Sequence, residues 1–544
     1  MRTPMFGFVL LIATVALPLT LIHAQAKDET STVKVEATKT DTAKPDQFKA
    51  EQQASKGSVT IGGNVVNYDA YAGTIVVHPK GWDDVPQNAD PDPKNRGAEA
   101  SMFYVAYFKS DNKGAPRPVT FLYNGGPGSS TVWLHMGAFG PKRVLTADDS
   151  HTPAAPYSVV NNEYSLLDVS DLVFVDAPGT GFSRLSGKDR EKAFYGVDQD
   201  AEAFADFISQ FLSKYGRWNS PKYLFGESYG TTRSAVLANI LETDRNVDFN
   251  GVILLSQILN FSLDSDVPEF NPGIDVAYQL NLPTYAASAW YHHKLPDQHP
   301  DLQSLLAEVE HFAMNEYAVA LGAGSSLPAD QRHAIAAKLH EYTGLPVAYI
   351  EKADLRINGG EFSKNLQDDS NLTTGRLDTR FSGPNFDPLS KEAEYDPQSA
   401  AISSAYVSAF NDYVRKELKF GENREYKPEI ENEAFRAWSF AHQPPGASFP
   451  FPGATNVMLD LAVAMKYNPT LKILLNAGYF DLATPFYEGV YEMQHLPIPP
   501  ELQKNIEFKF YESGHMVYAH EASLKAIHDN VAAFIQKSYN AKTK

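Results

Sequence analysis

Residues 223–230 of the chain are Tyr223-Leu224-Phe225-Gly226-Glu227-Ser228-Tyr229-Gly230. This stretch joins a short apolar run to a Gly-x-Ser-x-Gly pattern, and a helix-like run continues over residues 231–241. Glycines on both sides of a serine at such a junction are typical of a sharp turn from strand to helix, because side chains there would crowd the strained backbone. Such a turn lifts the serine hydroxyl clear of the sheet, where a base can remove its proton. The stretch therefore predicts a nucleophile at Ser228.

Further apolar runs of strand length lie on both sides of this motif. They cover residues 119–122, 172–175, 252–255, 473–475 and 506–510. Apolar residues repeat every three or four positions over 204–215 and again over 524–534, which is typical of helices with one buried face. Buried strands that alternate with amphipathic helices predict an α/β fold with a doubly wound, mostly parallel sheet.

The N-terminal region differs from this pattern. Residues 1–26 carry an early arginine, an apolar run and then small residues, which predicts a cleaved secretory signal peptide. A retained membrane anchor is the alternative, but the run is short for a span and Pro18 interrupts it. Residues 27–57 are polar and predict a disordered tether. We therefore expect an exported protein, periplasmic or extracellular, with no stable membrane insertion after cleavage.

The folded part is expected to consist of a core over residues 58–260 and 452–544. Three short runs near its beginning predict antiparallel strands at one sheet edge: residues 59–61, 74–77 and 102–108. Residues 261–451 break the alternation with helical patterns and Gly-, Pro- and Asn-rich loops. An independent second domain is the alternative, but strands resume afterwards, so we expect a helical cap inserted into the core.

Composition excludes some functions. The formal charge is −19, from 66 acidic and 47 basic side chains, and such a surface repels the phosphate backbone of nucleic acids. The chain contains no cysteine, so it can form no disulfide in a compartment that permits one. This absence favours a bacterial periplasmic protein over a secreted eukaryotic one. No Cys/His ligand cluster is evident, and we expect neither a metal nor a cofactor.

The acid and base that a serine nucleophile needs are predicted in the last part of the chain. In this kind of sheet the order is serine, acid, histidine. Asp481 follows the apolar run 473–475 and His515 follows the run 506–510, so both are expected in loops at strand ends. Each has a simpler interpretation, as a turn aspartate or a surface histidine, and Asp460 lies in a helical run where it suits the role less well. Their pairing predicts Asp481 and His515 as the triad partners of Ser228.

Two backbone N–H groups are predicted to stabilise the oxyanion. One belongs to Tyr229, directly after the nucleophile, and the other is expected in an early loop. Asn124-Gly125-Gly126-Pro127-Gly128 follows the run 119–122, and Gly126 is the expected second donor. A tight turn without function is one alternative. A phosphate cradle is another, but Pro127 lacks an N–H and no lysine closes the loop.

With these segments in place, the sequence resembles the serine carboxypeptidase family of α/β-hydrolases. The resemblance rests on four blocks, Asn124-Gly125-Gly126-Pro127-Gly128-Ser129-Ser130 with Gly140-Pro141, Asp176-Ala177-Pro178-Gly179-Thr180-Gly181-Phe182-Ser183, Gly226-Glu227-Ser228-Tyr229-Gly230 and Gly514-His515-Met516. It implies a metal-free enzyme that releases the C-terminal residue of peptides, commonly at acid pH. It also implies that Asn124 and Glu227 bind the terminal carboxylate of the substrate. Glu227 can face a carboxylate only if one proton is shared between them, which agrees with an acid optimum.

The sequence departs from the family pattern at four positions. Leu122 stands where tryptophan is usual, Ala138 where an acidic residue is usual, Thr231 where a second glycine is common and Tyr518 where proline is usual. The carboxylate-binding network is therefore expected to be incomplete. An esterase or acyltransferase on the same scaffold remains an alternative to a peptidase. A binding protein without catalysis would need a damaged triad, and the three residues are intact.

Overall fold

The computed structural model describes residues 48–82, 97–110, 116–297, 299–453 and 455–540. The predicted signal peptide and residues 27–47 of the predicted tether lie outside the described residues. The described strands are β1 Gln52–Ile61, β2 Asn64–Val77, β3 Glu99–Lys109, β4 Val119–Tyr123, β5 Lys142–Val144, β6 Val159–Asn161, β7 Asp171–Val175, β8 Arg184–Ser186, β9 Lys222–Glu227, β10 Gly251–Leu255, β11 Leu372–Thr374, β12 Ser382–Pro384, β13 Lys472–Gly478 and β14 Ile506–Tyr511. The described α-helices are α1 Arg190–Phe194, α2 Val197–Lys214, α3 Tyr229–Asn239, α4 Val276–Tyr291, α5 Leu302–Phe312, α6 Ala318–Ala323, α7 Ala329–Thr343, α8 Val347–Lys352, α9 Gly359–Asn365, α10 Pro397–Lys416, α11 Asn432–Arg436, α12 Met458–Tyr467, α13 Phe486–Gln494, α14 Pro500–Gln503 and α15 Glu521–Asn540.

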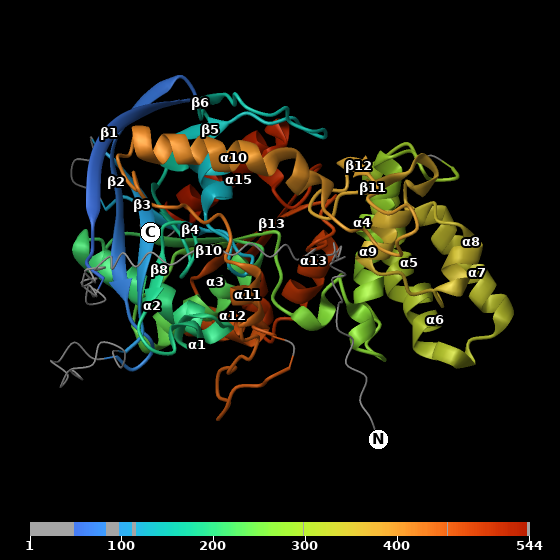
Figure 1. Cartoon of the computed structure of the whole chain (residues 1–544). Coiled ribbons are helices and arrows are strands. Elements are labelled where there is room, and N and C mark those ends of the chain that lie inside the picture. Colours follow the sequence, from blue (N-terminus) through green and yellow to red (C-terminus); the bar gives the residue numbers. More distant parts are fainter. Residues whose placement is uncertain (1–47, 83–96, 111–115, 298, 454, 541–544) are drawn as a thin grey trace, which may run out of the picture. The chain divides into compact units, whose positions relative to one another are not determined.

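A ten-stranded sheet runs through the described part of the chain. Its order is β1-β2-β3-β7-β4-β9-β10-β13-β14, and β8 pairs with β3 beside this path (Figure 1). The strands from β7 to β14 along this order are parallel, whereas β1, β2 and β3 are antiparallel. The predicted doubly wound sheet with an antiparallel edge is confirmed.

Strand β1 begins earlier than the sequence predicted. Residues 52–57, assigned to the disordered tether, pair with β2 over the whole length of β1, from Gln52 opposite Gly73 to Ile61 opposite Asn64. This half of the strand is mostly exposed and lies at the sheet edge, so its order depends on backbone hydrogen bonds rather than on apolar side chains. A polar edge strand has few apolar residues, so the sequence pattern predicts a disordered tether that ends too late in the chain.

Two apolar layers cover the two faces of the sheet. Successive strand residues point to opposite faces, so Phe121 joins the layer that holds α2, α3 and α12, and Leu122 joins the layer that holds α10 and α15. Figure 1 shows these two groups of helices on opposite sides of the strands. The strands between the layers are buried on both faces, which explains their continuous apolar sequence.

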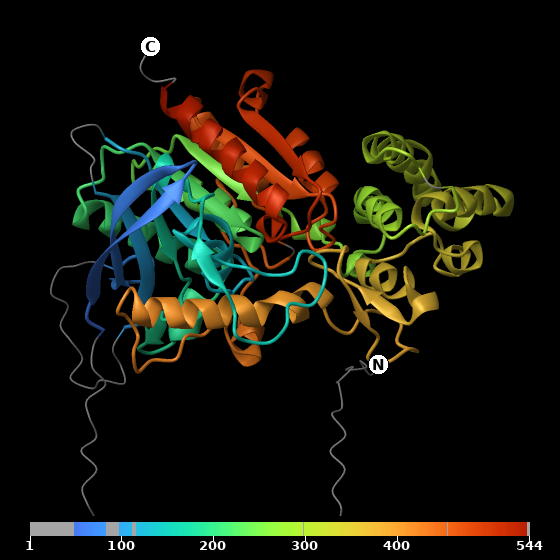
Figure 2. The ribbon, with the colours of Figure 1, turned by 90° about the horizontal axis from the view of Figure 1, so that it is seen from above.

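The chain between β10 and β13 includes most of the residues expected to form a helical cap, and only its first half has an apolar core of its own. Helices α4 to α9 surround a third apolar cluster that extends from Tyr278 to Leu366. Helix α10 instead packs Ile402, Tyr406 and Phe410 onto the sheet layer. Figure 2 shows α10, in orange, beside the sheet-bearing part and apart from the yellow-green helices. A helical pattern reveals a buried face but not its partner, so the second half of the insertion differs from the predicted cap.

A fully buried ion pair joins the helices beneath the motif. Arg233 on α3 donates from Nε to Asp200 Oδ2 on α2 at 2.6 Å, and both side chains are 0% exposed. Its Nη1 donates to the carbonyl of Asn124 at 2.8 Å, and its guanidinium lies 4.3 Å from the ring centre of Phe204. One side chain therefore connects α2, α3 and the loop after β4.

We expect Asp200→Asn to lower the free energy of unfolding by ~3–5 kcal/mol, because it leaves the buried guanidinium of Arg233 without a counter-charge. Asp412→Asn is the matched control, since Asp412 forms an exposed pair with Lys416 and should change stability by less than about 1 kcal/mol. Denaturant unfolding measures both. Equal stability of the two variants would show that the buried pair is not needed.

Candidate active site

The turn after β9 places Ser228 in a strained backbone conformation. Its φ of 59° and ψ of −131° lie outside the regions that non-glycine residues usually adopt. The N–H of Ser228 donates to the carbonyl of Leu255 at 2.9 Å, and its carbonyl accepts from the N–H of Thr231 at 2.7 Å. A Cβ at Gly226 would collide with the carbonyl of Gly230. The turn is held from both sides, and Ser228 is half-buried at its apex.

Asp481 and His515 meet at the same edge of the sheet. Strands β13 and β14 are parallel neighbours, with Gly478 opposite Tyr511, so the loops that follow them lie together. Asp481 Oδ2 is 2.8 Å from His515 Nδ1. The predicted pair is thus in direct contact, and strand β9, which leads to Ser228, ends at the same edge two strands away.

Asp481 is held by groups that the sequence prediction missed. Its Oδ1 accepts from the N–H groups of Ala483 at 2.9 Å and Thr484 at 3.0 Å. The hydroxyl of Thr484 donates to Asp481 Oδ2 at 2.7 Å. A Thr three residues after an Asp can close this kind of local turn, and that spacing was the signal available in the sequence. The carboxylate is therefore fixed in position toward His515.

The ring of His515 is buried beside two carboxyl groups. Burial lowers the pKa of His515, but the charges of Asp481 and Glu227 and the hydrogen bond to Asp481 outweigh it and raise the pKa above its ordinary value. The N–H of His515 donates to the carbonyl of Leu377 at 2.6 Å, and its carbonyl accepts from the Ser256 hydroxyl at 2.7 Å. The histidine is fixed through its backbone as well as its ring.

The glycine-rich loop after β4 lies directly against the serine turn. A Cβ at Gly125 would come within 2.7 Å of the carbonyl of Glu227 and collide with the backbone nitrogen of Tyr229. Only glycine permits this approach. The two predicted oxyanion donors, Gly126 and Tyr229, are therefore on neighbouring segments.

Glu227 lies buried between the serine turn and the histidine loop. The hydroxyl of Tyr518 is 2.9 Å from Glu227 Oε2 and 3.1 Å from Oε1, and Asn124 also hydrogen-bonds Glu227. Burial raises the pKa of Glu227 to about 7, although nearby His515 and the hydrogen bonds act in the opposite direction. The two predicted carboxylate-binding residues are thus together, and Tyr518 joins them.

Two of the other departures from the family pattern, at Leu122 and Ala138, contribute no polar side chain. Leu122 is 0% exposed and packs in the apolar layer of α10 and α15. Ala138 is also 0% exposed, within residues 134–139. These two positions therefore offer no hydrogen-bonding side chain, and the incomplete network stays a prediction.

Residues of the insertion form hydrogen bonds with the loops that carry Asp481 and His515. Asp378 Oδ2 accepts from the N–H of Gly514 at 3.1 Å, and Thr379 donates its N–H to the carbonyl of Phe480 at 2.9 Å. Arg376 pairs with Asp266 at 2.6 Å and lies near enough to lower the pKa of His515. The sequence prediction missed these contacts, because they join positions about a hundred residues apart in a region without a motif.

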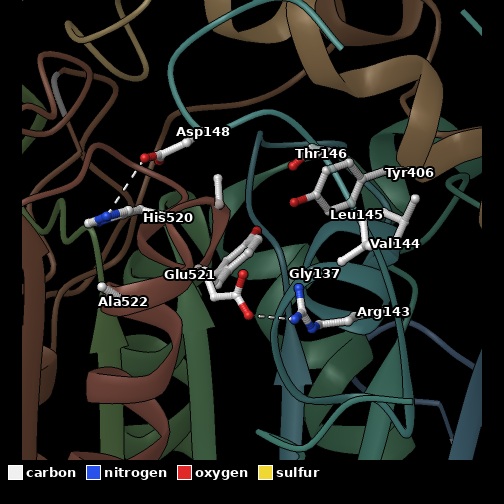
Figure 3. Close-up of a pocket in the computed structure, with 12 residues that line it drawn as sticks. Gly137, Arg143, Val144, Leu145, Thr146, Asp148, Tyr406, His520, Glu521 and Ala522 are labelled. Carbon is white, nitrogen blue, oxygen red and sulfur yellow. Dashed lines mark hydrogen bonds and ion pairs between the residues drawn. The ribbon is translucent and has the colours of Figure 1, made fainter. Parts of the chain in front are cut away.

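A cavity of about 270 Å³ adjoins Tyr518. Figure 3 shows four polar side chains that line it in two pairs, Arg143 with Glu521 and Asp148 with His520. The Arg143–Glu521 distance is 2.9 Å and the Asp148–His520 distance is 3.7 Å. Among the described residues, no group of three His, Cys, Asp or Glu side chains is arranged to hold a metal ion.

Comparison with solved structures shows that a known protein shares this fold. Kex1, a prohormone-processing carboxypeptidase from Saccharomyces cerevisiae, aligns over 86% of this chain and 91% of its own, with a TM-score of 0.53 and 15% sequence identity. The predicted α/β-hydrolase fold is confirmed by this likeness.

Sequence comparison finds relatives among the serine carboxypeptidases for part of the chain. Residues 93–319 match the family model described as serine carboxypeptidase, which supports the predicted family. The chain is 34% identical over 136 residues to a carboxypeptidase Y homolog from Arthroderma benhamiae, covering 25% of each protein. It is 27% identical over 165 residues to the pheromone-processing carboxypeptidase KEX1 of Saccharomyces cerevisiae, covering 29% of this chain and 21% of that protein. The chain thus spans about a quarter of the length of these relatives, and the family match includes Ser228 but neither Asp481 nor His515.

Asp481→Asn should lower the pKa of His515 below its ordinary value. The substitution removes the strongest group that raises the pKa and leaves burial, which lowers it. NMR titration of ¹³C-labelled histidine in both proteins measures the shift. An unchanged pKa would mean that Asp481 does not set the charge of His515.

Proposed function

We propose that this protein is a serine-type carboxypeptidase that releases C-terminal residues from peptides through an acyl-enzyme on Ser228. The observation that carries the proposal is the position of buried Glu227, which adjoins the serine in the chain and contacts Asn124 and Tyr518. Protonated Glu227 and the amide of Asn124 leave this point uncharged, so that a substrate carboxylate can be bound next to the nucleophile. The family match over residues 93–319 supports the same activity.

The reaction uses Ser228, His515 and Asp481 as a triad. His515 takes the proton of Ser228 as the hydroxyl attacks the carbonyl, and Asp481 orients the ring and stabilises its positive charge. His515 then protonates the leaving amine, and it activates the water that hydrolyses the acyl-enzyme. The N–H groups of Gly126 and Tyr229 stabilise the oxyanion.

The proton on Glu227 links substrate recognition to pH. A substrate carboxylate beside an ionised Glu227 would be repelled, so binding requires the protonated form. The pKa of Glu227 is about 7, and the protonated form prevails below that value. His515 must be neutral to act as a base, so the active state has the shared proton on Glu227 rather than on the imidazole.

An esterase or acyltransferase is the second candidate. Leu122 and Ala138 supply no hydrogen bond to a substrate carboxylate. An enzyme that accepts esters would keep the triad and need no such bond. Comparing turnover of matched esters and peptides, with an alcohol acceptor present, separates the two functions.

We also propose that the enzyme is exported, as the sequence of residues 1–26 indicates, to a periplasmic or extracellular location. In the part of the chain that the structure describes, no helix is long and apolar enough to cross a membrane.

Peptides are the proposed partners. The proposed chemistry uses neither a metal nor another cofactor, and addition of EDTA should leave the activity intact.

Ser228→Ala should abolish covalent labelling by a fluorophosphonate probe, because the probe reacts only with an activated serine hydroxyl. The exposed serine variant Ser213→Ala is the control and should label fully. Gel fluorescence measures labelling, and circular dichroism checks the fold. Full labelling of Ser228→Ala would exclude this serine as the nucleophile.

Amidation of the substrate's C-terminus should lower kcat/KM roughly tenfold to a hundredfold. The amide loses a buried, charge-assisted hydrogen bond worth about 1.5–3 kcal/mol. For free peptides, kcat/KM should fall as the pH rises through about 7, because Glu227 loses its proton there.

Glu227→Gln should remove that fall and reduce the effect of amidation, since the glutamine amide is neutral and is a donor without taking up a proton. Steady-state kinetics between pH 4 and pH 9 test both statements. Equal cleavage of free and amidated peptides by the wild type would refute the carboxypeptidase and favour the esterase.

A further inference from the structure

Tyr518 lies inside the candidate site and packs against Gly137, the neighbour of Ala138 in the chain. Ala138 offers no acidic group there, and the phenol hydroxyl of Tyr518 lies within hydrogen-bond distance of both Glu227 oxygens instead. Tyr518 follows His515 by three positions in the same loop, within the short 3-10 helix Val517–Ala519. The chain therefore delivers a hydroxyl to Glu227 from the segment that carries the histidine.

The position of this hydroxyl is fixed by packing. Tyr518 is 2% exposed and Glu227 is also 2% exposed. The ring lies against the backbone of Gly137, where a Cβ would come within 2.7 Å of Cδ2 and 2.8 Å of Cε2 of Tyr518. Tyr518 also lines the cavity that Gly137, Arg143 and Asp148 line. A phenol held so closely points its hydroxyl at Glu227 without a loss of side-chain entropy on binding.

The hydrogen-bonding capacity of a phenol decides what this hydroxyl can do. It carries one proton and can also accept. While Glu227 is ionised, Tyr518 must donate to it, and the proton is not available to a substrate. Once Glu227 is protonated, the carboxyl O–H can donate to the Tyr518 oxygen, and the tyrosine proton becomes free. Burial and the charge of Glu227 raise the pKa of Tyr518 well above its ordinary value, so the phenol keeps its proton throughout the working range.

We propose that Tyr518 is a substrate-binding residue that donates its O–H to the terminal carboxylate of the peptide while it accepts the O–H of Glu227. Asn124 supplies a second donor from its side-chain amide. The inference rests on the proposed carboxypeptidase function and names the group that replaces the missing acid. The donor next to the substrate is then a neutral phenol, and Glu227 acts through it.

The arrangement explains how a site without a second acid can still bind a carboxylate. Two neighbouring acids must share a proton, whereas a tyrosine brings its own proton and adds no charge. The pH dependence of carboxylate binding then comes from the proton of Glu227, whose pKa the neighbouring His515 lowers. It follows that deletion of the Tyr518 hydroxyl should weaken binding of free acids more than binding of amides.

The test is Tyr518→Phe, assayed on one peptide with a free and with an amidated C-terminus. We expect the preference for the free acid to fall about tenfold, mainly through a higher KM, as expected for the loss of one hydrogen bond to a charged group. Tyr413→Phe is the matched control, because it deletes a buried hydroxyl that contacts Tyr107 and not Glu227. Inhibition by an N-acylated amino acid and by its amide, measured with an ester substrate, gives the same comparison without peptide turnover.

The outcomes separate the two claims. A wild type without preference for the free acid refutes the proposed function and this inference together. If the preference of the wild type for the free acid persists in Tyr518→Phe, the inference alone is refuted. The same holds if the free acid inhibits the variant more tightly than the wild type, because Tyr518 would then only fill space in the binding site. If Tyr518→Phe folds poorly, Gly137→Ala displaces the ring instead and should reduce the same preference.

Discussion

The strained turn at Ser228 is the constraint on which the rest of the site depends. A residue with a φ of 59° is unfavourable by itself and persists only where its surroundings hold it. Here the N–H of Ser228 is tied to β10 through Leu255, and the bare backbone of Gly125 presses against the turn from the other side. Arg233, one turn further along α3, bonds the carbonyl of Asn124 and the carboxylate of Asp200. The same contacts that fix the serine thus also place the loop with the predicted oxyanion donors.

The charges of Glu227 and His515, which lie near this turn, depend on which of the two side chains carries a shared proton. Glu227 and His515 are buried and influence each other's pKa in opposite senses, so a proton on one favours its absence from the other. The Asp481 carboxylate, held by two backbone N–H groups and Thr484, favours a charged imidazole. A substrate carboxylate next to Glu227 would shift the proton back to the glutamate and leave His515 neutral. Binding of the proposed substrate would in this way prepare the base.

The sequence predicted the parts of the fold that have a strong local signal. Buried parallel strands such as β9 and β13 are continuous apolar runs, and the residues after them were identified because strand ends share one edge. Strand β1 was predicted too short because an exposed edge strand has few apolar residues. The partner of α10 could not be predicted, since its apolar face fits a cap or a sheet equally well.

For the site, the missed residues act through contacts between distant segments. Asp378 reaches Gly514 across 136 positions, and no local pattern marks such a contact. Tyr518 was noticed only as a departure from the family pattern, and its contact with Glu227 required the folded chain.

The proposed carboxypeptidase should remove residues one at a time from a free C-terminus. Mass spectrometry of a single defined peptide, sampled over time with purified enzyme at pH 5, follows this order of release. We expect a ladder of products, each shorter by one C-terminal residue, that appear in order. Internal fragments that appear before any such ladder would exclude a carboxypeptidase.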